Sequence, residues 1–311
     1  MDGNMGSVLL PACFLGLYLI LEAADWGLCL AAPILGRTHE ERRAVLRLMR
    51  PCLDGNELWF FMGLYMMISL FPEMQGHSYA LWAAVLVGVG ALLRMGAVLF
   101  ADKLAGPVAA KILSGAAVVI LAALSMVGTS LLREDGAAFT AMGVTGAIWM
   151  LLACFQVGTL YGAVKAVNPL AERCRAASLV SSVLSVVVYL IFAVLLWYET
   201  GDAWTTDGTF WMCLIATALL FSASFFLTRS RHAPLGLAAA YASAFFAIVV
   251  YFSAYVTVLP IYHHLDTASL RAAMSEVPGT VFLVAAVVWS GASFLWRMMR
   301  KKETYHWEDH I

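Results

Sequence analysis

Apolar residues run through this chain in long stretches that short polar segments separate. About 20 apolar residues in a helix cross the ~30 Å hydrocarbon core of a bilayer. The pattern predicts an all-α integral membrane protein, a bundle of about nine transmembrane helices in a single domain covering residues 1–311. The first stretch is long enough to permit a tilt or a break near its acidic residues, and the second is short. The expected spans are Gly6–Leu35, Asn56–Phe71, Ala80–Phe100, Ile112–Leu132, Phe139–Val164, Ala177–Tyr198, Thr209–Leu227, Leu235–Leu259 and Val277–Trp296.

Basic residues are concentrated in every second one of the segments that connect these spans. Sixteen of the 19 Lys and Arg residues fall in the odd-numbered connecting segments and the C-terminal tail, and in this count Arg297 belongs to the tail. The even-numbered segments hold only Arg133 and Arg271, and Arg94 lies within a span. By the positive-inside rule, the N-terminus is expected outside and the C-terminus in the cytoplasm.

The composition supports a membrane protein and excludes several other classes. The chain is 62% hydrophobic and 13% charged, whereas a soluble domain has about 25% charged residues. The net charge of −1 and the absence of a basic patch outside the connecting segments argue against nucleic-acid binding. The six cysteines follow no metal-binding or disulfide spacing, and none of the seven histidines lies within a span. We therefore expect no haem ligand and no metal site in this chain.

Five ionisable residues fall within spans or at their edges. They are Glu22, Asp25, Asp54, Glu57 and Arg94. A charge at mid-membrane costs about 2.5–3.5 kcal/mol on insertion scales, so such a residue is expected to face protein or water and to have a function. Asp25 lies about 18 Å along a helix from Arg37, which is near mid-membrane. The four acids form two pairs, Glu22 with Asp25 and Asp54 with Glu57. The members of each pair are three residues apart and therefore share one helix face.

These residues allow a structural and a functional interpretation. Asp54 and Glu57 have the spacing of a helix cap directly before an apolar run. The same acids, with Glu22 and Asp25, would suit a proton pathway or a cation site. Asp54 at the cytoplasmic mouth and Asp25 deeper in the membrane would then give an order for proton transfer. Arg94 pairs with buried acids in either interpretation.

The first connecting segment, RTHEERRAVLRLMR, predicts a short helix of its own. Thr38 and Glu41 have the spacing of a capping box. Arginines then alternate with apolar residues, which is typical of a basic helix on the inner membrane surface.

The stretch EAADWGLCLAAPILGRTHEERRAVLRLMRPCLDGNELWFF, residues 22–61, is similar to the N-terminal signature of subunit II of cytochrome bd-type quinol oxidases. That signature contains GFD-x-GVG, then LGR followed by ERR, then WDGN and a further Trp. A later segment, FQVGTLYGAVKAVNPLAERCRAA, resembles the QGATY segment of the family and the basic loop that follows it. The matching residues of the signature are Asp25 and Gly27, Gly36–Thr38, Glu41–Arg43, Asp54–Asn56 and Trp59.

The resemblance implies a subunit of a quinol:oxygen oxidoreductase in the bacterial cytoplasmic (inner) membrane. Such an enzyme oxidises quinol, reduces dioxygen to water and generates a proton-motive force. Its haem-bearing subunit I would hold haems b and d and form a heterodimer with this chain, which would ligate no cofactor itself. This chain would scaffold subunit I, with Asp25 and Asp54 on a proton or cation route and Trp59 on an apolar oxygen route. A structural quinone and a small single-helix accessory subunit are left open.

The sequence departs from the family pattern beside the two key acids. Leu53 replaces the Trp before the second acid, and Ala23 and Ala24 replace the Gly-Phe before the first. The proline and acid that follow the family arginine are absent after Arg94. Two other functions therefore stay open: a stand-alone proton- or ion-coupled transporter, which buried acids would also suit, and a purely structural subunit.

Overall fold

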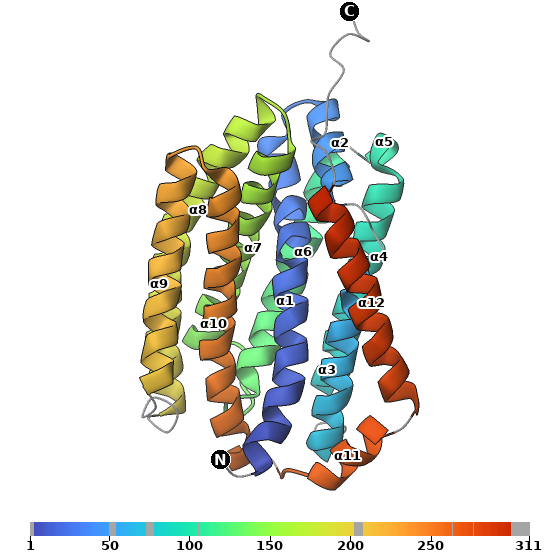
Figure 1. Ribbon diagram of the computed structural model, residues 1–311, viewed down its shortest axis with the longest axis vertical. Helices are drawn as coiled ribbons and strands as arrows, with labels where there is room; N and C mark the ends of the chain where they lie inside the picture. Colours follow the sequence, from blue (N-terminus) through green and yellow to red (C-terminus); the bar gives the residue numbers. More distant parts are fainter. Residues whose placement is uncertain are drawn as a thin grey trace, which may run out of the picture.

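The computed structural model describes residues 3–49, 54–72, 78–104, 106–201, 208–262, 264–275 and 277–299. Every regular element within these residues is an α-helix, and the helices run along one another as a bundle (Figure 1). The helices are α1 Gly3–Leu35, α2 His39–Leu48, α3 Glu57–Leu70, α4 Ser78–Leu99, α5 Ala101–Leu104, α6 Pro107–Ser130, α7 Ala141–Lys165, α8 Leu170–Thr200, α9 Gly208–Arg229, α10 Ala233–Tyr262, α11 Thr267–Ser275 and α12 Val277–Met299.

Each of the nine predicted spans contains a helix, which confirms the predicted class of helical membrane bundle. Within the described residues, seven helices are long and apolar enough to cross a membrane: α1, α4 and α6 to α10. The helix α3 and the apolar part of α12, Leu283–Met299, are shorter. That these two also cross the membrane stays a prediction. The short helices α5 and α11 were not predicted from the sequence.

The helix α1 lies at the centre of the bundle, where it packs against α3, α6, α7 and α10 (Figure 1). It is helical over its whole length, so the break that the sequence permitted near its acids does not occur. Glycines allow α7 to approach it closely. A Cβ atom at Gly27 would lie 1.9 Å from the Cys154 carbonyl oxygen, and one at Gly158 would lie 2.4 Å from the Gly27 carbonyl carbon. Only glycine fits these two positions.

The helix α3 begins inside the bundle rather than at its end, and this explains its 14-residue length (Figure 1). The preceding residues, Asp54, Gly55 and Asn56, are not helical, yet all three are buried. Gly55 has a φ of 78°, and a Cβ atom there would lie 2.8 Å from Cγ of Trp289 in α12. Non-helical backbone at membrane depth is tolerated where protein surrounds it. The segment before α3 is therefore enclosed by the bundle, which the sequence pattern did not predict.

The two ends of the bundle carry different short helices. The helices α2 and α5 lie at the end where the C-terminal helix α12 finishes, and α11 lies at the other end with the start of α1 (Figure 1). The predicted capping box of α2 is confirmed, since Thr38 caps the helix and the Glu41 carboxylate accepts the Thr38 backbone N–H. Glu41 also pairs with Arg173 of α8, which fastens α2 to the bundle.

Candidate functional site: a buried acid–arginine cluster

The five ionisable residues singled out in the sequence lie together inside the bundle, joined by a sixth. We call these six residues the acid–arginine cluster. Four of them have side chains that are at most 1% exposed, and the other two are largely buried. The members are Glu22 and Asp25 of α1, Asp54 before α3, Glu57 of α3, Arg94 of α4 and Arg297 of α12. Four helices thus converge on one group of charges.

Arg94 is the centre of one half of the cluster. Its guanidinium group forms ion pairs with Glu22 and Glu57. It also lies 3.7 Å from the Asp25 carboxylate and 3.8 Å from the Asp54 carboxylate. The expectation that Arg94 pairs with buried acids is confirmed, and a single arginine contacts the acids of both pairs.

Arg297 is the centre of the other half, and sequence reasoning missed it. Its Nη2 donates to Oδ2 of Asp25 and to Oδ2 of Asp54, each at 2.5 Å. Both acids therefore contact the same nitrogen atom, and the order of proton transfer from Asp54 to Asp25 stays a prediction. The sequence held one signal: Met298 and Met299 follow Arg297, so the apolar run does not end at this residue.

Asn56 links the two halves of the cluster and was also not predicted. Its side-chain Nδ2 donates to Oε1 of Glu22 at 2.9 Å. Its backbone N–H donates to Oδ1 of Asp54 at 3.2 Å. Buried carboxylates need such donors because their desolvation is otherwise uncompensated.

The predicted helix cap by Asp54 and Glu57 is wrong. The N-cap residue of α3 is Asn56, and its side chain forms no capping hydrogen bond. Asp54 instead accepts the Asn56 backbone N–H two residues on, which shapes the turn before the helix. Glu57 is the first residue of α3, and its carboxylate turns to Arg94. Ion pairing with helices α4 and α12 took precedence over local capping.

The charges of the cluster do not balance, because four carboxylates face two guanidinium groups. An uncompensated buried charge costs several kcal/mol, so a carboxylate in excess is more stable with a proton bound. Oxygen atoms of Glu22, Asp25 and Asp54 lie within 4.8 Å of one another, as in a cation site. The two arginines already supply positive charge there, which favours protons over a metal ion as the exchangeable species.

Trp59 follows Glu57 in α3 but does not line the apolar cavity found within the described part of the bundle. Its ring packs on Phe14 with centroids 5.2 Å apart, and its Nε1 donates to Ser290 Oγ at 2.9 Å. The cavity, of about 330 Å³, is bordered mainly by α1, α3, α6, α7 and α10. The assignment of Trp59 to an oxygen route stays a prediction.

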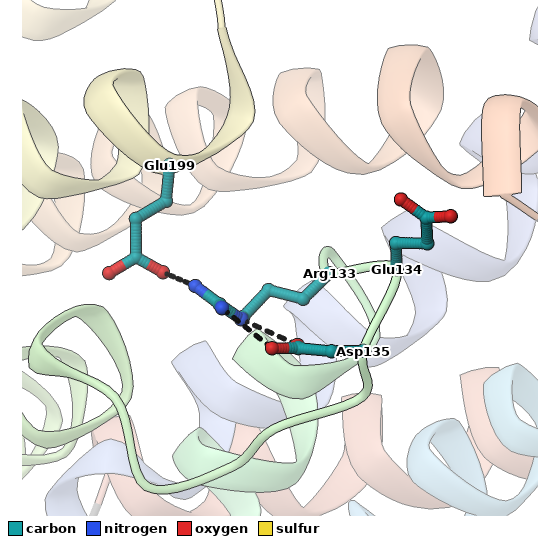
Figure 2. A pocket seen from close by; sticks show the side chains of 4 residues that line it. All are labelled: Arg133, Glu134, Asp135 and Glu199. Atoms are coloured by element: carbon teal, nitrogen blue, oxygen red, sulfur yellow. Dashed lines mark hydrogen bonds and ion pairs between the residues drawn. The ribbon is translucent and has the colours of Figure 1, made fainter.

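A second charged group lies at the other end of the bundle, in the loop between α6 and α7. Arg133 forms two hydrogen bonds of 2.8 Å with Asp135 and an ion pair with Glu199 at the end of α8, whereas Glu134 points away (Figure 2). The hydrogen bonds from Arg133 hold the pKa of Asp135 well below its usual range. These residues border a cavity of about 550 Å³. Their mutual pairing, with Arg133 and Glu199 partly buried and Asp135 exposed, is typical of a structural ion-pair group.

Three of the seven histidines lie in the described part of the chain. His39 begins α2, His232 lies between α9 and α10, and His264 lies before α11. The other four, His77, His263, His306 and His310, lie outside the described residues, as do the basic residues Arg50, Arg300, Lys301 and Lys302. The prediction that this chain ligates no haem therefore stays a prediction.

Comparison with known proteins gives a consistent result. The family model described as cytochrome bd terminal oxidase subunit II matches residues 6–301. A chain of the solved bd oxidase structure from Geobacillus thermodenitrificans is similar with a TM-score of 0.65 and 16% sequence identity, and the match covers 96% of each chain. At this identity the likeness shows the fold alone. No match was found among curated protein sequences.

The family match and the apolar helices agree about the location of the chain. The seven helices in the described part of the chain that are suited to crossing a membrane, together with the family, identify a multi-pass protein of the bacterial inner membrane. The match extends well beyond the N-terminal signature, since it covers nearly the whole sequence. This chain belongs to the cytochrome bd terminal oxidase subunit II family.

Proposed function

We propose that this chain carries cytoplasmic protons through the acid–arginine cluster toward a haem-bearing subunit I, in a complex that oxidises quinol and reduces dioxygen to water. The observation that carries this proposal is the excess of carboxylates over guanidinium groups at a buried site. Protons must be delivered to the oxygen-reducing centre of such an enzyme, and a buried group of acids that share protons is suited to that task.

The geometry supports proton exchange within the cluster. Asp25 and Asp54 contact one nitrogen of Arg297, so a proton can leave one carboxyl and bind the other without either side chain moving far. Oδ1 of Asp25 is buried and has no hydrogen-bond partner in the described part of the chain. An oxygen in this position is an acceptor for an incoming proton.

The other parts of the proposal follow from family membership. Haems b and d would reside in subunit I, quinol would be the substrate of the complex, and this chain would stabilise its partner. Large apolar side chains cover the outside of the bundle; Val180 and Val284, for example, are 63% and 56% exposed. Such a surface suits lipid and a membrane partner equally. Family membership favours this function over the stand-alone transporter.

The test uses the complex purified with its haem-bearing partner. Asp25→Asn and Asp54→Asn each remove one proton-binding site and keep the size of the side chain. We expect quinol-dependent oxygen uptake per haem to fall about tenfold or more, with slower proton uptake, because positioned proton transfer contributes at least this much. Haem content from visible spectra reports assembly separately.

Glu199→Gln is the matched control. It neutralises an acid that also pairs with an arginine, at the opposite end of the bundle. We expect this variant to change stability at most, with normal turnover per haem. Full haem content with unimpaired turnover and proton uptake in both cluster variants would refute the proposed pathway. Lower assembly with normal turnover per assembled complex would indicate a structural subunit instead.

A further inference from the structure

Arg297 reaches the cluster from a helix at the edge of the bundle. Within the described residues, α12 packs mainly against α3 and α11 at the edge of the bundle (Figure 1), and many of its apolar side chains are exposed. Val288 and Leu295, for example, are 65% and 60% exposed. Arg297 itself is only 8% exposed and lies in the last turn of α12. A long arginine side chain can extend from the end of a helix toward distant partners.

Three contacts fix α12 against the start of α3. Trp289 packs on Gly55, where a Cβ atom would not fit. Ser290 accepts the hydrogen bond from Trp59 Nε1. The third contact is made by Arg297, which donates hydrogen bonds to Asp54 before α3 and to Asp25 of α1. The position of α12 therefore determines whether these two acids have a shared positive partner.

Arg297 supplies one of the two positive charges that the four acids face. Without it, Arg94 alone would compensate four carboxylates, of which it contacts Glu22 and Glu57 directly. Arg94 lies farther from Asp25 and Asp54, at 3.7 and 3.8 Å. Among the described residues, the phenols of Tyr241 from α10 and Tyr18 from α1 are further titratable groups near Arg297 and Arg94. Neither is a cation that could replace Arg297.

We propose that Arg297 is the positioning residue of the cluster: it holds Asp25 and Asp54 as one proton-sharing pair and sets how many protons the cluster binds, so that docking of α12 controls proton occupancy. This inference rests on the proposed function and assigns its regulation to α12. When Arg297 is docked, a proton on the Asp54 carboxyl passes to the Asp25 carboxylate, which leaves Asp54 ionised and ready for the next proton. When α12 is not docked and the Arg297 guanidinium group is away from the cluster, both Asp25 and Asp54 retain protons.

Arg297→Met tests this inference, because methionine keeps much of the side-chain length and removes the charge. We expect protonated-carboxyl absorption in the infrared difference spectrum to increase in the assembled complex. We also expect the alkaline limb of the turnover profile to move about 1–3 pH units higher, since an opposite charge at this distance has an effect of that size. Arg297→Lys keeps the charge and should return both measurements toward the original values.

Lys165→Met is the matched control. Lys165 donates to the Met298 carbonyl oxygen at 3.3 Å, so the variant removes a positive charge beside the same helix end without touching the acids. If Arg297→Met prevents assembly, the double variant Asp54→Asn with Arg297→Met removes one acid together with its cation. We expect this double variant to assemble better than Arg297→Met alone.

Three results would overturn the inference: an unchanged infrared band and pH profile in Arg297→Met, the same change in Lys165→Met, or no better assembly of the double variant. The proposed function fails separately. If Asp25→Asn and Asp54→Asn leave proton uptake normal, the pathway is refuted, while the infrared band still reports whether Arg297 sets proton occupancy. If those variants slow proton uptake and Arg297→Met changes nothing, only the role of Arg297 is refuted.

Discussion

At the scale of single residues, two glycines decide how closely the central helix can approach its neighbour. Gly27 of α1 and Gly158 of α7 face each other, and a Cβ atom at either position would overlap backbone atoms of the other helix. Without a hydrophobic driving force between membrane helices, such close contacts supply much of their association energy. The crossing of α1 and α7 also fixes the height of Glu22 and Asp25 within the bundle.

Gly158→Val is therefore expected to destabilise the chain by about 3 kcal/mol, the upper end of the usual cost of overpacking. The measurement is the thermal stability of the detergent-solubilised complex, followed by size-exclusion chromatography. Gly88→Ala is the control, because no atom lies within 4 Å of a Cβ atom at Gly88. Equal melting temperatures for the two variants would show that α1 and α7 can separate at little cost.

The residues of the candidate site could be predicted only in part. An acid or arginine inside an apolar run is conspicuous, and Asp25 and Arg94 were found in this way. Arg297 was missed because basic residues at the end of an apolar run normally lie in water. Its side chain turns inward only because α12 packs on α3, and a sequence pattern carries no information about that contact.

At the scale of elements, α2 shows how a surface helix is fixed to a membrane bundle. Burial opposes ionisation of Glu41, but the hydrogen bond from Arg173 and the backbone N–H groups of Thr38 and Arg37 outweigh it. The pKa of Glu41 is therefore lowered. A lowered pKa in the folded state means that ionised Glu41 stabilises the fold above the pKa of the unfolded chain, about 4.3. This stability is lost as the pH falls through the lower folded pKa.

Glu41→Gln is expected to lower stability at pH 7 by about 1.5–3 kcal/mol, the range for hydrogen bonds to charged groups. The difference from the original protein should shrink as the pH falls from 7 to well below about 4.3, because Glu41 itself becomes protonated there. Thermal unfolding at each pH measures this difference. Glu40→Gln is the control, since the Glu40 side chain is 49% exposed and its pair with Arg43 should contribute little. A constant difference across this pH range would contradict the assigned role of Glu41.

Elements were easier to predict than their depth in the bundle. Apolar runs located every long helix because composition alone determines whether a segment can enter lipid. The depth of α3 could not be predicted in this way. Asn56 was expected to begin a span and Asp54 to cap it, and only the surrounding helices α1, α4 and α12 make a buried position possible for them.

At the scale of the whole molecule, the distribution of charge predicts which end of the bundle faces the cytoplasm. The basic helix α2 and the end of α12 lie at one end of the bundle (Figure 1). The end of α8, where Glu199 pairs with Arg133 (Figure 2), lies at the other. The acid–arginine cluster receives Arg297 from the basic end. With the orientation that the positive-inside rule predicts, the proposed pathway would take its protons from the cytoplasm, as the generation of a proton-motive force requires.

Cysteine labelling tests this orientation directly. In a Cys13→Ala background, Phe139→Cys places a thiol in the α6–α7 loop, where Phe139 is 88% exposed. Lys103→Cys places one in the exposed part of α5, at the opposite end. In spheroplasts, a membrane-impermeant maleimide should label Phe139→Cys at once and Lys103→Cys only after permeabilisation. The parent background shows the labelling of the remaining cysteines. The reverse pattern would place the basic end outside, and the cluster would then draw protons from the wrong side of the membrane to support an oxidase.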